Sequence, residues 1–169
     1  SMEIPKRAAS VAILAICVAY ILFRFWRLTD SCLWFDEIFS VHAAEHSWGE
    51  LFWFVAQDLI HPPLFYVLLK FWIGIGGDSV FWLRLLPVLF SIVALVPFVF
   101  LCRELKLKTS STLLALTIFA VSGSLIKYAQ EVRMYSLLLC LSLFSIWLFA
   151  RFFFRGKNIW ILTLVNILL

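Results

Sequence analysis

Residues 84–108 read RLLPVLFSIVALVPFVFLCRELKLK, and this stretch decides the fold. Its central run, Leu85–Cys102, carries no charged residue. As a helix, the run is long enough to cross the roughly 30 Å hydrocarbon core of a bilayer. The RELKLK group that follows it is rich in cations, and cations are enriched in cytoplasmic loops. The stretch therefore predicts a membrane-spanning helix whose C-terminal end faces the cytoplasm.

The whole chain has the composition of a membrane protein. Of its 169 residues, 64% are hydrophobic and 18% aromatic, and the mean hydropathy is +1.02. A soluble domain does not need so much apolar surface, so we expect an all-α integral membrane protein. The net charge of +4 is modest and forms no tract typical of a nucleic-acid binder. The four cysteines, at 17, 32, 102 and 140, have neither CxxC nor metal-ligand spacing, which argues against a disulfide framework.

Other charge-free runs predict a multi-pass helical bundle that forms a single transmembrane module over residues 1–169. Lys6 and Arg7 precede the first run without a cleavage site after it, so we expect a retained span and not a signal peptide. Arg24 and Arg27 are expected to snorkel to the far interface. The expected spans are about 8–27, 80–102, 109–126, 134–154 and 158–169.

The apolar stretch 62–76 has two possible interpretations. It is short for a crossing, and Lys70 interrupts it. If it spanned the membrane, the basic groups RELKLK and RFFFRGK would both move outside, against the positive-inside rule. We therefore predict a helix in the outer interface, with Pro62 and Pro63 at its tolerated first turn. Further interfacial helices are expected at 36–46 and 48–58, which gives a long outer loop, 28–79, and a short one, 127–133.

Two adjacent carboxylates stand out in the long loop. The sequence LWFDEIFSVH, residues 33–42, places Asp36 and Glu37 among bulky apolar side chains. Ionisable groups near a membrane are costly, which favours a functional role; the alternative is a solvated helix cap. Asp36 could accept a proton from an acceptor hydroxyl or amine. Glu37 lies about 100° further round the helix and is given a supporting role.

Four cations are expected at the same interface and could bind phosphate. The alternative for Lys127 and Arg133 is snorkelling to lipid headgroups, and Arg84 could instead pair with Asp78. Lys70 completes the set on the interfacial helix.

The short outer loop adds a carboxylate next to a guanidinium. Glu131 and Arg133 are two residues apart in YAQEVRMY and could serve the acceptor and the leaving group respectively. The alternative is a surface ion pair that contributes little. His61, directly before Pro62, could donate to a phosphate or a sugar, or make a structural hydrogen bond.

A metal site is only weakly indicated. His42 and His46 have a spacing that permits one, but no further ligand set is evident, so a solvated pair is the preferred interpretation. A divalent metal is possible but has no support in the sequence.

Four short motifs occur in a recognisable order: WFDE at 34–37, HPPL at 61–64, RLLP at 84–87 and YAQEVRMY at 128–135. In this order and at these topological positions they resemble the GT-C glycosyltransferases. The nearest resemblance is to the bacterial dolichyl-phosphate-mannose-protein mannosyltransferase-like group, which includes the lipid A aminoarabinose transferases. It covers nearly the whole chain.

The resemblance implies a multi-pass enzyme that takes a sugar from a polyprenyl-phosphate donor at the outer face, with inversion. It places Asp36 at the position of the catalytic acidic residue and Glu37 as its partner. The implied setting is a bacterial plasma membrane, with membrane lipids around the protein and a protein, lipid or glycan as acceptor. The family's other motif positions fall on His61, Arg84, Glu131, Arg133 and Tyr135.

Members of that family are several times longer than this chain. We therefore expect the chain to be the N-terminal part of a catalytic module, which a C-terminal part or a partner subunit would complete. A non-catalytic membrane subunit or scaffold is the main alternative. A small transporter or channel is disfavoured, because the expected spans contain almost no ionisable residues.

Overall fold

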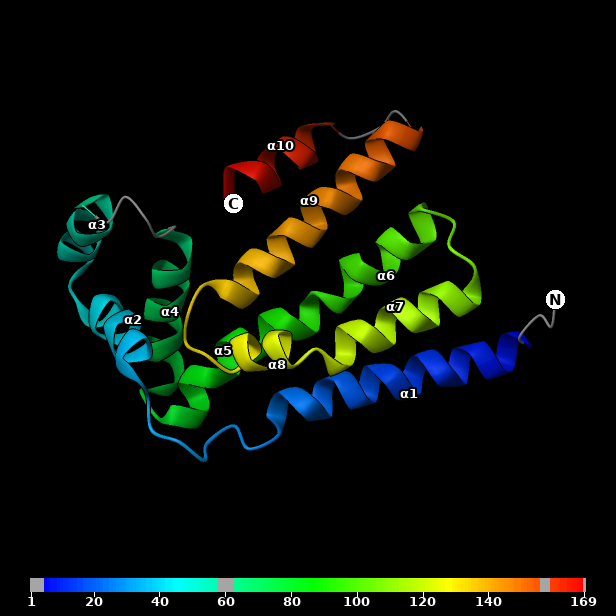
Figure 1. Cartoon of the computed structure of the whole chain (residues 1–169). Helices are drawn as coiled ribbons and strands as arrows, with labels where there is room; N and C mark the ends of the chain where they lie inside the picture. Colours follow the sequence, from blue (N-terminus) through cyan, green and yellow to red (C-terminus); the bar gives the residue numbers. More distant parts are fainter. Residues whose placement is uncertain (1–4, 58–62, 156–158, 169) are drawn as a thin grey trace.

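The computed structural model describes residues 5–57, 63–155 and 159–168, and within these ranges the regular structure is entirely helical (Figure 1). The helices follow one another through short connections, some of which turn within two or three residues. The ten helices are α1 (Lys6–Phe25), α2 (Phe35–Glu45), α3 (Trp48–Gln57), α4 (Pro63–Gly76), α5 (Val80–Val93), α6 (Leu95–Glu104), α7 (Thr109–Val121), α8 (Gly123–Ala129), α9 (Tyr135–Arg155) and α10 (Ile159–Leu168).

Three of the described helices are long and apolar enough to cross a membrane. They are α1, the nearly continuous α5 and α6 over Val80–Glu104, and α9 over Tyr135–Phe154. They correspond to the spans expected at 8–27, 80–102 and 134–154. Helix α10 covers the described part of the expected last span and packs along α9 (Figure 1).

The span expected at 109–126 consists of two helices, which together are apolar enough to be one bent span. Helix α7 ends at Val121, and α8 leaves it at an angle of 55°. The cause is Ser122, whose ψ of 111° is not helical and whose hydroxyl accepts a hydrogen bond from the Leu125 N–H. A serine in this position caps a new helix instead of continuing the old one. The charge-free run concealed the break, because hydropathy does not report backbone direction.

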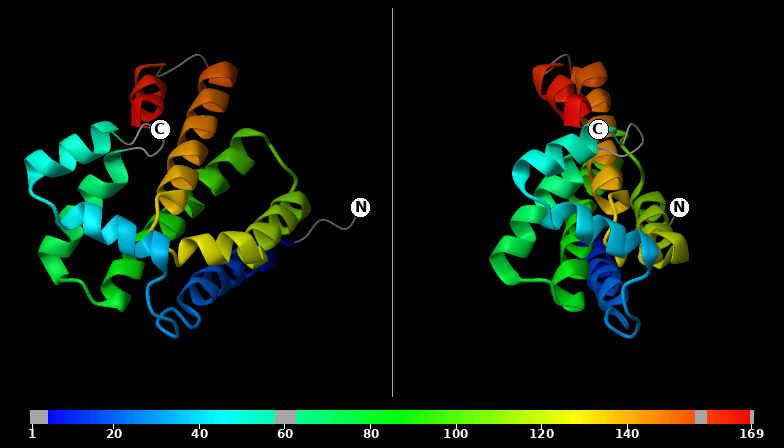
Figure 2. Two further views of the ribbon diagram at one scale, coloured as in Figure 1. Left: turned by 60° about the vertical axis from the view of Figure 1, so that its left-hand side comes forward. Right: turned by 90° about the vertical axis from the view of Figure 1, so that its left-hand side faces the viewer.

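Helices are present where interfacial helices were expected, as α2, α3 and α4, grouped at one end of the molecule (Figures 1 and 2). Helix α4 has 14 residues and is about 21 Å long, shorter than the roughly 30 Å of a hydrocarbon core. We call this end, which also contains residues 26–34 and 130–134, the loop end. The opposite end, where α1 begins and α6 turns into α7, is the basic end.

A tight turn joins α4 to α5 at the loop end. Gly77 has a φ of +88°, which favours glycine. The Trp72 and Trp82 rings stack with centroids 4.1 Å apart, and each indole N–H donates to the other residue's carbonyl. A Cβ on Gly76 would lie 2.1 Å from the Trp82 ring. The close ring contact therefore depends on the absence of a side chain at residue 76.

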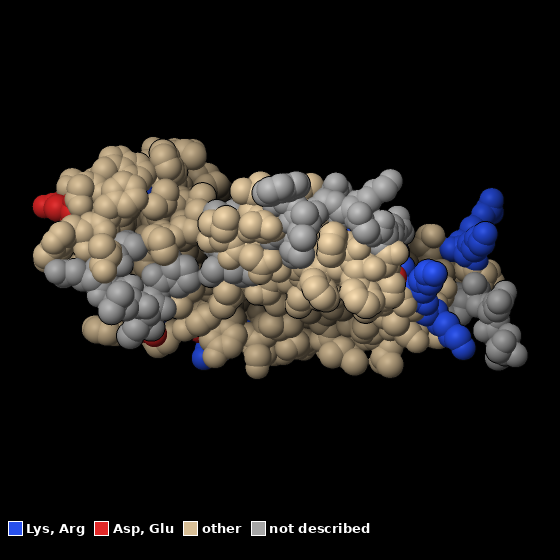
Figure 3. Space-filling view, turned by 90° about the horizontal axis from the view of Figure 1, so that it is seen from above, with Lys and Arg blue, Asp and Glu red and all other residues tan. Residues whose placement is uncertain are grey.

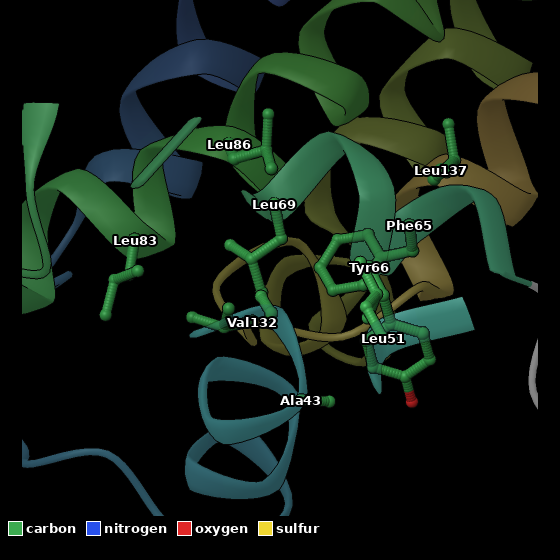
Figure 4. Packing of buried hydrophobic residues seen from close by; sticks show 10 residues of the cluster. Ala43, Leu51, Phe65, Tyr66, Leu69, Leu83, Leu86, Val132 and Leu137 are labelled. Carbon is green, nitrogen blue, oxygen red and sulfur yellow. The ribbon is translucent and has the colours of Figure 1, made fainter. Parts of the chain in front are cut away.

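Two apolar clusters hold the helices together. At the loop end, Leu51, Phe65, Leu69, Leu83 and Val132 join α3, α4, α5 and the segment before α9 (Figure 4). The second cluster joins α1, α6 and α7 further along the bundle; its buried members are Tyr20, Leu95, Leu116, Phe119 and Ala120.

Charged side chains gather at the two ends of the molecule and leave an apolar middle, as Figure 3 shows for one face. The described exposed cations of the basic end include Lys6, Arg7, Arg103, Lys106 and Lys108. Large apolar side chains are exposed between the ends, for example Leu14 at 65% and Ile118 at 60%. This distribution suits a bundle with lipid around its middle and water at its ends.

Candidate functional site

A buried ion pair organises the loop end. Glu37, in the first turn of α2, is fully buried, and Arg84, in the first turns of α5, is 5% exposed. The Glu37 Oε1 atom accepts from Arg84 Nε at 3.0 Å, and Oε2 accepts from Arg84 Nη2 at 2.9 Å. This is the two-pronged geometry in which guanidinium and carboxylate bind each other most strongly.

The remaining lone pairs of Glu37 are also used. The backbone N–H of Val132 donates to Oε1 at 3.1 Å, and that of Trp34 donates to Oε2 at 3.1 Å. One side chain thus joins the start of α2, the start of α5 and the segment between α8 and α9. With all four bonds in place, both oxygens of the Glu37 carboxylate are occupied by the protein.

Arg84 uses its other N–H groups on the connection that precedes α2. Nη1 donates to the carbonyls of Leu28 at 2.8 Å and Ser31 at 3.0 Å, and Nη2 donates to that of Cys32 at 3.1 Å. The alternative that Arg84 pairs with Asp78 is therefore wrong. As a phosphate-binding residue Arg84 stays a prediction, but in this arrangement all its donors are occupied by the protein.

Asp36 differs from its neighbour. Its side chain is half-buried, and the described part of the chain provides no hydrogen-bond or ion-pair partner for its carboxylate. Its backbone carbonyl is held from two sides: Ser40 Oγ donates to it at 3.1 Å and Arg133 Nη1 at 3.5 Å. The first turn of α2 therefore presents Asp36 on a fixed backbone with its carboxylate available.

Arg133 lies under the same helical turn. It is 5% exposed, and its Nη1 also donates to Ser40 Oγ at 3.4 Å. Ser40 was not among the residues singled out from the sequence, because a buried serine on a helix carries no pattern of its own. The alternative of snorkelling to headgroups is wrong for Arg133, whose guanidinium points into the protein.

Glu131 is a buried carboxylate next to Asp36. It is 7% exposed; Oε1 lies 3.7 Å from Lys127 Nζ, and Oε2 has no hydrogen-bond partner among the described residues. Burial raises the pKa of the Glu131 carboxyl above its usual value, Lys127 opposes this, and the charges of Glu37 and Asp36 add to it. The Glu131 carboxyl thus lies in the field of two other carboxylates, with the exposed ammonium group of Lys127 beside it.

Lys70 is engaged elsewhere. Its ammonium group donates to the carbonyls of Ala44 and His46 at the C-terminal end of α2 and lies 5.2 Å from the Trp48 ring centroid. A cation at this position satisfies carbonyls that α2 leaves open. The predicted phosphate contact of Lys70 stays a prediction.

The other predicted residues fall at the margin of the site or outside it. Tyr135 is half-buried and packs against Tyr128 with ring centroids 4.7 Å apart. His61 lies outside the described residues. The rings of His42 and His46 meet edge to face at 4.8 Å, and the described ranges contain no group of three or more His, Cys, Asp or Glu placed to hold a metal.

Another buried arginine, Arg24, contradicts its prediction. Arg24 was expected to snorkel, but it is fully buried. Its Nε donates to Ser91 Oγ at 2.8 Å, and its Nη atoms donate to the carbonyls of Ala120 at 3.1 Å and Phe119 at 3.2 Å, at the end of α7. The Tyr20 ring lies under the guanidinium, 3.2 Å from centroid to Cζ. Arg24 thus holds α7 where it breaks.

Gln130 links this network to the candidate site. Its side-chain amide donates to the carbonyls of Arg24 at 3.0 Å and Trp26 at 2.7 Å, where α1 ends. Because Glu131 is the next residue, the end of α1 fixes the backbone from which the buried carboxylate projects. Sequence reasoning missed Gln130, because its partners are backbone carbonyls more than a hundred residues earlier.

Comparisons with protein-family models, curated proteins and solved structures found no match.

Proposed function

We propose that this chain is a membrane glycosyltransferase, or the N-terminal module of one, that transfers a sugar from a polyprenyl-phosphate donor. The observation that carries the proposal is the Asp36 carboxylate, which is half-buried and has no hydrogen-bond or ion-pair partner among the described residues. It lies on a helical turn that Glu37, Arg84 and Arg133 hold in place. The motif resemblance names the reaction, and this geometry is compatible with it.

In this proposal the loop end lies outside the membrane. The exposed cations Lys6, Arg7, Arg103, Lys106 and Lys108 gather at the opposite end, and the positive-inside rule then puts that end in the cytoplasm. A multi-pass arrangement of GT-C type in a plasma membrane follows, with the donor's polyprenyl chain in the bilayer and its phosphate at the loop end.

Asp36 would act as the base. It accepts the proton of the acceptor hydroxyl as that oxygen attacks the anomeric carbon, while the bond from that carbon to the phosphate oxygen breaks with inversion. The leaving group is polyprenyl phosphate, a good leaving group that needs no dedicated acid. Lys127, whose ammonium group is exposed at the site, would stabilise the phosphate charge.

The test is transfer of a labelled sugar from polyprenyl-phosphate donors in membranes that contain the protein at its natural length. Asp36→Asn keeps the shape and removes the base, so we expect transfer to fall by about 100-fold or more. The matched control is Glu45→Gln, which removes an exposed carboxylate from the same helix and should transfer like wild type.

Equal transfer by wild type and Asp36→Asn would refute the role of Asp36. If folded wild type transfers from none of a series of donors, the glycosyltransferase proposal fails. A non-catalytic membrane subunit would then be the better interpretation.

A further inference from the structure

The basic end holds a pocket that shares no residue with the candidate site. It lies between α6 and α9, has a volume of about 200 Å³, and is lined by Phe100, Arg103, Glu104, Trp147 and Arg151. Helix α9 and the stretch α5–α6 run from the loop end toward the basic end, so the pocket and Asp36 are at opposite ends of the bundle (Figure 1).

Two guanidiniums reach this pocket from neighbouring helices. Arg103 lies over the Phe100 ring with Cζ 5.9 Å from the centroid, and Arg151 lies over the Trp147 ring at 5.6 Å. The two rings pack against each other at 5.1 Å. Cation–π contacts of this kind restrict a long side chain without using its N–H groups, which stay available to a ligand.

The charge balance of the pocket favours an anion. Arg103 is exposed and Arg151 half-buried, whereas the Glu104 residue is only 9% exposed and offers a ligand little surface. The connection that follows α6 carries two further exposed cations, Lys106 and Lys108, which do not line the pocket. An anion at the mouth of the pocket would therefore meet the two guanidiniums.

The apolar face of α6 next to the two arginines indicates that the ligand also has an apolar part. Val96, Phe100 and Arg103 are spaced four and three residues apart on α6, so they share one face of the helix. Val96 is 46% exposed and Phe100 37%. A binding site with guanidiniums at its mouth and an exposed apolar face running away from them fits an amphiphile, with its anionic group at the end of the helices and its chain along them.

We propose that this pocket binds the phosphate headgroup of an anionic phospholipid. Arg103 and Arg151 donate to the phosphate oxygens, a contact that guanidinium makes bidentately. The acyl chains lie along the apolar face of α6 next to Val96 and Phe100. Basic pockets between membrane helices are suited to such headgroups, because the cytoplasmic leaflet is rich in anionic lipid. The proposal is independent of the glycosyltransferase assignment.

The experiment counts lipid bound to the full chain, purified from nanodiscs of phosphatidylcholine with a fixed share of phosphatidylglycerol. Native mass spectrometry gives the phosphatidylglycerol retained per chain for wild type and two double variants. Arg103→Gln/Arg151→Gln removes the pocket cations. Lys106→Gln/Lys108→Gln, the matched control, removes the same charge from the adjoining connection.

We expect the pocket variant to retain about tenfold less phosphatidylglycerol than wild type, and the control to change by less than about twofold. A tenfold loss corresponds to about 1.4 kcal/mol, well within the range of a lost charge-assisted contact. An equal loss in the two double variants would mean general surface attraction and would overturn the proposal, as would full retention by the pocket variant.

Two further measurements distinguish a lipid from a free anion and test the role of the guanidinium groups. Inorganic phosphate in excess should leave the lipid bound; if it displaces the lipid, the pocket recognises the free anion and the lipid proposal fails. Arg103→Lys/Arg151→Lys preserves the charge and serves if the glutamine variant does not fold. It should retain less lipid than wild type, because lysine cannot make the bidentate contact, and unchanged retention would contradict the assigned geometry.

Discussion

Two of the buried arginines, Arg84 and Arg24, are neutralised in different ways. Arg84, at the loop end, binds the carboxylate of Glu37. Arg24, in the bundle, contacts no carboxylate within the described part of the chain; its guanidinium donates to Ser91 and to the last carbonyls of α7. The C-terminal end of a helix carries roughly half a negative charge. The C-terminal end of a helix can therefore stabilise a buried cation where no acidic residue is available.

The difference also separates two structural tasks. The Glu37–Arg84 pair connects the starts of α2 and α5 to segments without regular structure, through hydrogen bonds to the backbone at residues 28, 31, 32 and 132. Arg24 joins three helices at the point where one of them breaks. Removing the Glu37 carboxylate leaves the Arg84 guanidinium buried without a counter-charge. Removing the Arg24 guanidinium leaves only neutral carbonyls without a donor. We therefore expect the two changes to lower the free energy of unfolding by different amounts.

The largest effect is expected from Glu37→Gln. The variant leaves the Arg84 guanidinium buried without its counter-charge, which costs about 3–5 kcal/mol in comparable pairs. The free energy of unfolding in detergent, from denaturant titration, measures it. Glu45→Gln, on the exposed side of the same helix, is the control and should change stability by less than about 0.5 kcal/mol.

A double variant tests whether Glu37 and Arg84 stabilise the fold as a pair. Glu37→Leu/Arg84→Met removes both charges, so it should destabilise by less than the sum of the two single changes. It should not regain full stability, because Arg84 also holds the carbonyls of residues 28, 31 and 32. Strict additivity would show that the pair does not act as a unit.

A smaller effect is expected from Arg24→Leu. The change leaves the carbonyls of Phe119 and Ala120 without a donor but leaves no charge unpaired, so we expect a loss of about 1–3 kcal/mol. The same denaturant titration measures it. Arg27→Leu, in which an exposed arginine is replaced, is the control. A loss for Arg24→Leu as large as that for Glu37→Gln would contradict the distinction between the two arginines.

The smallest expected effect on stability is that of Glu131→Gln. Unlike Glu37, Glu131 has one carboxylate oxygen, Oε2, without a hydrogen-bond partner among the described residues. Because the pKa of the Glu131 carboxyl is raised on folding, its protonated form stabilises the native state. That contribution is complete below the ordinary pKa of about 4.5 and is lost as the pH rises through the raised value. Glu131→Gln should therefore gain stability relative to wild type as the pH rises from about 4 to 8.

Melting temperatures of both proteins across this pH range give the readout. Glu45→Gln reports the general effect of removing one negative charge. If the difference between wild type and Glu131→Gln stays constant with pH, the environment assigned to Glu131 is wrong.

The sequence predicted the helices well where hydropathy and charge act alone. The helix expected at 62–76 is present as α4, Pro63–Gly76, and the first apolar helix is present as α1. Both are set by local composition. The break between α7 and α8 escaped prediction, because a serine cap inside an apolar run does not alter the hydropathy.

The contacts of the candidate site were less predictable. The sequence predicts distinct roles for Asp36 and Glu37, and the structure shows that Asp36 is half-buried and Glu37 fully buried. The partner of Glu37 was not identified, because Arg84 is 47 residues away in the chain. The partners of Arg24 were equally hidden, since carbonyl oxygens exist at every residue and leave no trace in a sequence.

The stacked tryptophans between α4 and α5 have a consequence for evolution. The indole of Trp82 occupies the space that a Cβ at residue 76 would need. Neither residue can change freely while the other is kept, so the two should behave as one inherited character. Among natural variants of this chain, a side chain at residue 76 should occur together with a smaller residue at 82, and the loss of Trp82 should release the requirement for Gly76.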